Sequence, residues 1–161
     1  MLTADRLREL LQYDPATGHF RWRVQRNSFG GKTKIGATAG QLNQGRIQIG
    51  LDGKRYLAHR LAWLYMTGAW PTLQIDHRDC DPLNNRWANL REATQSQNNA
   101  NRRPRGKLGF KGVSRNGNHG YFARIRVNGE EIYLGNFRTA VEAARVYAFA
   151  ARDLHGEFAR T

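Results

Sequence analysis

A histidine beside a carboxylate stands near the middle of the chain, and amide side chains follow it at short intervals. The pair is Asp76-His77, and the asparagines after it are Asn84, Asn85, Asn89, Asn98 and Asn99. A carboxylate and an amide oxygen can bind a hard divalent cation, and a neutral imidazole can take a proton from water. This set of residue types suits a metal-assisted phosphodiesterase.

Separate roles follow for the individual side chains. His77 is the candidate general base, because an ordinary imidazole titrates near pH 6.5. Asp76 and Asn98 are the candidate metal ligands, and two oxygen ligands that leave open positions suit Mg²⁺. Asn85 is assigned to holding the loop. Since neighbouring strand residues face apart, this arrangement requires the backbone to turn at His77. The alternative is a surface pair followed by turn-forming asparagines.

The charge of the chain points to a polyanionic partner. The 161 residues contain 26 Lys and Arg against 13 Asp and Glu, a net charge of +13. Such an excess favours nucleic acid, and arginine suits phosphate and guanine contacts. An incidentally basic protein is the alternative. An anionic membrane fits less well, because the charge is not gathered on one amphipathic helix.

Several protein classes are disfavoured. The sequence has no apolar run near the roughly 20 residues of a membrane span and no apolar segment typical of a secretory signal, which predicts an intracellular protein. The single cysteine, Cys80, excludes an internal disulfide framework and a cysteine-rich zinc finger.

The first 57 residues predict a helix followed by a β-rich region. Thr3 is a helix N-cap ahead of apolar positions at helical spacing. Residues 19–24 alternate as a strand, a loop with Gly30 and Lys32 follows, and residues 46–49 and 55–57 form a hairpin that turns at Asp52-Gly53. A helix over residues 60–67 ends at Gly68. This region either positions backbone phosphates or covers the rest of the protein.

The candidate site lies on a strand, a loop, a second strand and a helix. Residues 75–77 and 90–93 are the expected strands, and Ser96 is the expected N-cap of a helix that carries Asn98 in its first turn. This order would bring the end of the first strand close to the start of the helix.

The C-terminal part predicts an α+β module. Residues 102–107 combine proline, glycine and charge and are the expected linker. Three strands follow, over residues 109–114, 121–127 and 131–137. Thr139 and Glu142 form a capping box for an alanine-rich helix that runs to about Leu154. Three strands packed on one helix complete a small module.

Residues 56–103 resemble the HNH endonucleases of the His-Me finger superfamily, in the form common among phage and homing enzymes. The matching blocks are Ala58-His59-Arg60-Leu61-Ala62, Ile75-Asp76-His77, Asn84-Asn85-Arg86, Asn89-Leu90 and Gln97-Asn98. The resemblance implies a ββα-metal fold with the general base at His77, Mg²⁺ or Mn²⁺ on Asp76 and Asn98, and Asn85 bracing the loop. It also implies that the ion binds the scissile phosphate and assists departure of the 3′ oxygen.

Two neighbouring residues of this segment are assigned to DNA. His59 sits where a strand meets a helix, and it either contacts a phosphate or braces the site as a structural histidine. Arg60 follows it and is assigned to DNA contact.

The C-terminal module resembles the DNA-binding domain of plant ethylene-response factors. The resemblance runs through Gly109–Val113, Ala123–Arg126, Tyr133–Phe137 and Thr139–Tyr147. It implies a sheet that lies in the major groove. The groove-facing candidates are Lys111, Arg115, Tyr121, Arg124, Arg126 and Tyr133. The expected core residues are Phe122, Ile125, Phe137 and Tyr147, with Arg124 and Arg126 on the strand face opposite Ile125.

The sequence thus predicts an α+β protein in four parts: residues 1–57, a nuclease core over 58–101, a basic linker over 102–107, and a DNA-binding domain over 108–161. The expected function is metal-dependent hydrolysis of double-stranded DNA, with no obligatory protein partner. One site per chain fits a monomer that nicks one strand or a dimer that cuts both. The alternatives are a catalytically inactive transcriptional regulator and, less favoured, an RNA-binding protein.

Overall fold

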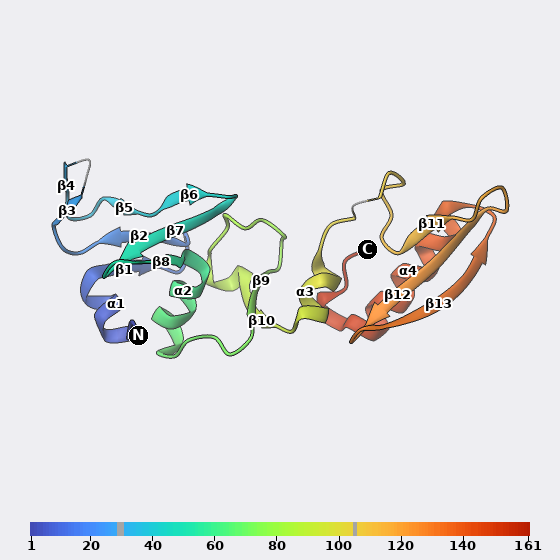
Figure 1. Ribbon diagram of the computed structural model, residues 1–161. Coiled ribbons are helices and arrows are strands. Elements are labelled where there is room, and N and C mark those ends of the chain that lie inside the picture. Colours follow the sequence, from blue (N-terminus) through green and yellow to red (C-terminus); the bar gives the residue numbers. More distant parts are fainter. Residues whose placement is uncertain (29–30, 105) are drawn as a thin grey trace. The chain divides into compact units, whose positions relative to one another are not determined.

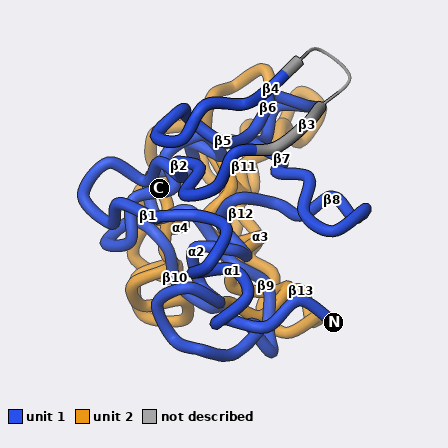
Figure 2. Tube along the Cα trace, turned by 90° about the vertical axis from the view of Figure 1, so that its left-hand side faces the viewer, with its two compact units in different colours: residues 1–92 blue, residues 93–161 orange. Residues whose placement is uncertain are grey.

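The chain folds into two compact units, residues 1–92 and residues 93–161, which Figure 2 colours separately. The computed structural model describes residues 1–28, 31–104 and 106–161 (Figure 1). Gly30 of a predicted loop and Arg105 of the predicted linker lie outside the described residues. Within the described part of the chain, every helix is too short or too polar to cross a membrane.

The first unit begins with a helix and a hairpin. In α1 (Ala4–Leu10), the Thr3 hydroxyl accepts a hydrogen bond from the Arg6 N–H, so the predicted N-cap is present. Strand β1 (Leu11–Asp14) pairs antiparallel with β2 (His19–Trp22), and β2 pairs with β5 (Thr38–Ala39). A short ribbon of β3 (Arg26–Ser28) and β4 (Gly31–Thr33) lies between β2 and β5 in the chain.

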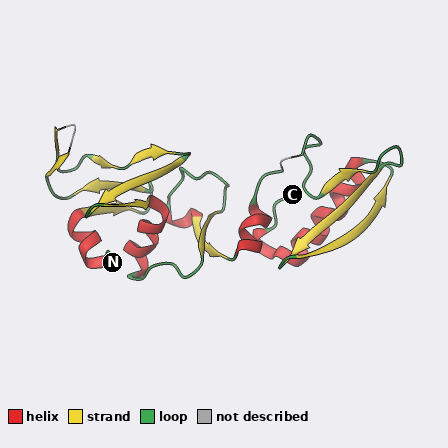
Figure 3. Cartoon of the chain, in the orientation of Figure 1, coloured by secondary structure: helices red, strands yellow, loops and turns green. Residues whose placement is uncertain are grey.

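A second small sheet contains β6 (Gln41–Asn43), β7 (Arg46–Leu51) and β8 (Lys54–Leu57). The predicted turn between β7 and β8 is confirmed, with positive φ at Asp52 and Gly53. Helix α2 (Ala58–Thr67) follows and ends at Gly68 in the left-handed conformation. Figure 3 shows α1 and α2 on the same side of these strands. The apolar core of this unit includes the buried residues Leu7, Leu11, Phe20, Ile49 and Leu61.

The first unit closes with the strands of the candidate site. Strand β9 (Gln74–His77) pairs with β10 (Leu90–Ala93), and the short 3₁₀ helix η1 (Trp87–Asn89) directly precedes β10. We call residues 78–89 the β9–β10 loop. Both predicted strands are therefore confirmed.

The second unit is a three-stranded sheet packed on a helix. Its strands are β11 (Val113–Arg115), β12 (Tyr121–Val127) and β13 (Glu130–Phe137), in the order β11-β12-β13, and α4 (Ala140–His155) covers one face. The core contains Ala123, Ile125, Ala143 and Tyr147. The Thr139 capping box is present. The first strand is shorter than predicted because Gly109 and Gly112 adopt positive φ, which interrupts an extended backbone.

Helix α3 (Gln95–Asn101) belongs to the second unit, which differs from the predicted boundary at residues 102–107. Ala93 and Ala100 pack with Phe158 of the 3₁₀ helix η2 (Gly156–Phe158), so α3 shares a small core with the C-terminus. The N-cap is Thr94, which forms a capping box with Gln97, and not Ser96. The Ser96 hydroxyl instead accepts a hydrogen bond from the Asn128 N–H at 3.0 Å.

Candidate functional site

Asp76 and His77 stand at the end of β9, in a segment that is buried although it is polar. Asp76 is 4% exposed and His77 is 7% exposed. The strand stops at His77, whose carbonyl accepts a hydrogen bond from the Cys80 N–H at 2.9 Å. The backbone therefore turns directly after His77. The two neighbouring side chains have different partners, as expected for adjacent strand positions.

The contact between His77 and Asn85 indicates which nitrogen of the imidazole carries the hydrogen. Nε2 of His77 lies 3.1 Å from Oδ1 of Asn85, and Nδ2 of Asn85 donates to the Leu83 carbonyl at 3.3 Å. The second contact orients the amide so that its oxygen faces the histidine. Because an amide oxygen only accepts, Nε2 carries the hydrogen and the lone pair of the neutral ring resides on Nδ1. The Asn85 side chain thus contacts both the loop backbone and the imidazole, and this arrangement favours the tautomer with hydrogen on Nε2.

Burial keeps the imidazole neutral. Burial is the main cause that lowers the pKa of His77, and the charge of Arg46 lowers it further. The hydrogen bond with Asn85 and the charges of Asp79 and Asp76 act in the opposite direction without reversing the shift. At neutral pH His77 is therefore in the form that accepts a proton.

His59 packs against His77 and is itself buried. The two rings meet edge to face with their centroids 5.1 Å apart, and His59 is 4% exposed. Burial, together with the neighbouring His77, lowers the pKa of His59 to about 3. This geometry favours the bracing role over direct contact with a phosphate. Arg60 is half-buried, with its guanidinium 5.8 Å from the centre of the Trp70 ring.

The β9–β10 loop is held by a network centred on Asp79. The Asp79 carboxylate accepts hydrogen bonds from the side-chain amides of Asn84 at 2.6 Å and Asn89 at 2.9 Å. The Asn89 side chain also accepts from the Asp79 N–H and donates to the Asn84 carbonyl. Burial acts to raise the pKa of Asp79, but these hydrogen bonds and that from the Asp81 N–H lower it. The asparagine pattern therefore serves mainly to fix the loop that carries Asn85.

Asp76 forms a buried ion pair across the two strands. Nε of Arg91, in β10, donates to Oδ2 of Asp76 at 2.9 Å, and both side chains are less than one-tenth exposed. This contact orients the carboxylate assigned to the metal. The second assigned ligand, Asn98, lies half-buried in α3 of the other unit. A shared site for Asp76 and Asn98 stays a prediction.

The outer face of the second unit's sheet carries the basic candidates. Arg124 and Arg126 point away from the buried Ile125, and both pair with Glu131 of β13, at 3.1 and 3.4 Å. Tyr133 stands opposite Arg124 in the register and is 59% exposed. The guanidinium of Arg124 also lies 5.6 Å from the centre of the Phe122 ring. This face thus combines arginines with aromatic rings.

Tyr121 and Phe122 lie on the opposite faces of the sheet from those predicted. Tyr121 packs on the core beside Ala123, whereas Phe122 shares the outer face with Arg124. The reason is strand alternation, since Tyr121 has the parity of the buried Ala123. Arg115 is exposed at the end of β11, opposite Tyr121 in the register.

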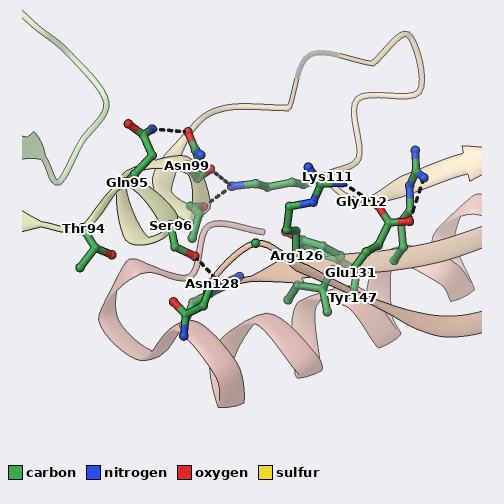
Figure 4. A pocket seen from close by; sticks show the side chains of 15 residues that line it. Thr94, Gln95, Ser96, Asn99, Lys111, Gly112, Arg126, Asn128, Glu131 and Tyr147 are labelled. Carbon is green, nitrogen blue, oxygen red and sulfur yellow. Dashed lines mark hydrogen bonds and ion pairs between the residues drawn. The ribbon is translucent and has the colours of Figure 1, made fainter.

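Lys111 also differs from the groove-facing prediction. Its ammonium donates to the carbonyls of Asn99, Ala100 and Arg102 at the end of α3. A cation at this end of a helix satisfies carbonyls that lack partners within the helix. Figure 4 shows Lys111 reaching toward Asn99 in a pocket of about 720 Å³ inside the second unit, which Arg126, Glu131 and Tyr147 also line.

Sequence reasoning assigned no role to three contributors, Arg91, Asp79 and Asn89. Arg91 was detectable as the one cation of a short strand that pairs with the strand carrying Asp76. Asp79 and Asn89 were visible as polar loop residues, but nothing in their spacing tells which amide meets which carboxylate.

The stability of the first unit is expected to depend on pH through His59. Its pKa is about 3 in the folded state and near 6.5 when unfolded, so the unfolded chain binds more protons between these values. This contribution is complete above pH 6.5 and is lost as the pH falls, by up to about 1.4 kcal/mol per unit. Urea unfolding followed by tryptophan fluorescence at pH 7 and pH 5 measures it. All four tryptophans, Trp22, Trp63, Trp70 and Trp87, lie in this unit.

The control for this prediction is His59→Gln, which removes the titrating group. The variant should lose less stability than the wild type between the two pH values. An equal loss would assign the pH dependence to other groups.

Comparisons with known proteins bear on the segment that contains this site. Residues 56–100 match the family model described as HNH endonuclease, the family that the motif resembles. Over 108 residues the chain is 35% identical to "Uncharacterized HNH endonuclease L560" of Acanthamoeba polyphaga mimivirus, covering 66% of this chain and 57% of that protein. The chain thus spans little more than half the length of this relative. No solved structure matches the chain.

Proposed function

We propose that this chain, in which residues 56–100 match the family model described as HNH endonuclease, is a metal-dependent DNA endonuclease that hydrolyses phosphodiester bonds. The observation that carries the proposal is the contact between His77 and Asn85, at 3.1 Å. It supports a neutral imidazole with its hydrogen on Nε2 and its lone pair on Nδ1. Such a ring can accept a proton from the water that attacks a phosphodiester.

The reaction has a simple balance. Water adds to phosphorus while its proton passes to Nδ1 of His77, and the bond between phosphorus and the 3′ oxygen breaks. The departing 3′ oxygen takes a proton from solvent, and His77 later releases its proton to solvent. The products are a 5′-phosphate and a 3′-hydroxyl. Asn85 holds the ring so that Nδ1 keeps its lone pair, and the Asp79 network holds the loop that carries Asn85.

Asp76 and Asn98 would hold the divalent cation, Mg²⁺ or Mn²⁺. A carboxylate and an amide offer only oxygen, which suits hard cations. In the described ranges, no group of three or more His, Cys, Asp or Glu side chains is placed to hold a metal ion. When bound, the cation supplies positive charge to the phosphate and the departing oxygen.

Double-stranded DNA is the proposed substrate, and the sheet of the second unit is its proposed docking face. The net charge of +13 supports a polyanionic partner. Arg124, Arg126 and Tyr133 share the outer face of this sheet, where they are accessible to a duplex. The resemblance of residues 108–161 to the plant DNA-binding domain is part of this proposal.

Incubation with supercoiled plasmid tests the activity. In Mg²⁺ the full chain should convert the plasmid to the nicked or linear form, and excess EDTA should abolish the conversion. Binding without cleavage in both Mg²⁺ and Mn²⁺ would refute the proposal and favour the inactive regulatory protein.

Removing the two arginines of the outer face should weaken DNA binding. Arg124→Ala with Arg126→Ala removes two positive charges, and we expect a loss of affinity of about tenfold to a hundredfold with a shallower salt dependence. The matched control is Arg145→Ala with Arg152→Ala, because these exposed arginines lie on α4 and change the net charge equally. Fluorescence anisotropy at two salt concentrations measures both. Equal losses would mean that the sheet face is not the docking surface.

A further inference from the structure

The turn of the first hairpin lies against the β9–β10 loop. The Tyr13 hydroxyl, at the end of β1, donates to the backbone carbonyl of Asn85 at 2.6 Å. Two residues further along each segment, the Trp87 N–H donates to the carbonyl of Pro15 at 3.0 Å. These two bonds join segments that are far apart in sequence, since Tyr13 and Asn85 are separated by 72 positions.

Gly18 shows how closely the two segments approach. It adopts φ +76°, and a Cβ atom at this position would lie 2.4 Å from the carbonyl carbon of Asn85 and 2.5 Å from the nitrogen of Arg86. No side chain fits in that space without displacing loop backbone. The hairpin turn is therefore shaped to the backbone on both sides of the Asn85 carbonyl.

Tyr13 suits this position because it is rigid and buried. It is 4% exposed, and its ring packs on Phe20 and Tyr65 with centroids 4.8 and 5.8 Å apart. Burial raises the pKa of Tyr13 well above its ordinary value, so the hydroxyl keeps its hydrogen and remains a donor. A fixed ring thus holds a hydrogen-bond donor at one point of the loop.

We propose that Tyr13 is a positioning residue for His77, acting through Asn85: its hydroxyl holds the Asn85 backbone, and the Asn85 side chain holds Nε2 of the imidazole. The first hairpin then forms part of the catalytic machinery, although it lies outside the segment that matches the family, residues 56–100. The kinetic part of this inference rests on the proposed function, whereas the structural part does not.

Tyr13→Phe tests the proposal because it removes the hydroxyl and keeps the ring. We expect kcat for DNA cleavage to fall about tenfold, equivalent to ~1.4 kcal/mol, while KM stays within about twofold. The second readout is the ¹⁵N signature of the His77 ring in the full chain at pH 7.5. The wild type should show hydrogen on Nε2, and the variant should shift toward a mixture of the two tautomers.

Ile49→Val is the matched control for stability. Ile49 is 1% exposed in the core of the same unit, and the loss of one buried methyl group costs about as much as the loss of one hydrogen bond. The control should retain kcat and the wild-type ring signature. The proposal is overturned if Tyr13→Phe leaves the signature unchanged, or if Ile49→Val alters kcat and signature equally. Because the ring signature is read without DNA, it decides the proposal even if the wild type does not cut.

Discussion

Replacing His77 with alanine is expected to slow single-turnover DNA cleavage by about a thousandfold. General base catalysis typically contributes 10² to 10⁴ in rate, and His59, the imidazole that packs against His77, is buried with its pKa lowered to about 3 and is therefore a weak substitute base. DNA affinity should change little, since the proposed docking face lies in the other unit. A quenched nicking assay at saturating protein, with anisotropy on the same preparation, measures rate and affinity separately.

The matched control is His19→Ala, which removes an exposed histidine from the same unit. It should cut at the wild-type rate. If His77→Ala also cuts at that rate, another group activates the water and the assignment of the base is wrong.

Removing the Asp76 carboxylate is expected to destabilise the first unit by about 3–5 kcal/mol. Asp76 and Arg91 are both buried, and Nε of Arg91 lies 2.9 Å from Oδ2 of Asp76. A buried guanidinium that loses its carboxylate partner carries the cost of desolvation without the gain of pairing. Asp76→Ala should therefore lower the urea midpoint read by tryptophan fluorescence. Cleavage should be lost as well, because Asp76 is the proposed carboxylate ligand.

The double variant Asp76→Ala with Arg91→Met separates these two effects. Replacement of a buried ion pair by apolar side chains is often neutral, so most of the lost stability should return. Cleavage should stay abolished because the proposed ligand is still missing. If the double variant is as unstable as Asp76→Ala, the ion pair is not the source of the stability, and if it cuts DNA, Asp76 does not hold the metal.

Local signals in the sequence predicted most of the secondary structure. The Thr3 cap, the Asp52-Gly53 turn, the Gly68 stop and the Thr139 capping box all lie where the residue types indicated. Each depends on a few adjacent residues, which a sequence displays directly. The compact units divide at residue 92 instead of at the predicted linker, because the division depends on long-range packing: Ala93 and Ala100 meet Phe158, about 60 residues later in the chain.

The distinction between local signals and long-range contacts also holds for the candidate site. The sequence singled out His77 and Asn85 separately, but it did not predict that their side chains meet or that burial lowers the pKa of His77. The sequence analysis placed Phe122 in the core and Tyr121 on the outer face, which is the reverse of the structure. Both residues are aromatic neighbours, and only the alternation relative to the buried Ala123 decides which one faces the core. Tyr13 gave no signal at all, since its role depends on a contact between distant segments.

Cleavage in ¹⁸O-labelled water tests the central claim most directly, namely that this chain hydrolyses DNA by attack of water at phosphorus. The wild type with Mg²⁺ should yield ends with a 3′-hydroxyl and a 5′-phosphate, and mass spectrometry should find one ¹⁸O atom in each new phosphate. A product without label, a 3′-phosphate end, or no cleavage of DNA that the protein demonstrably binds would contradict the account.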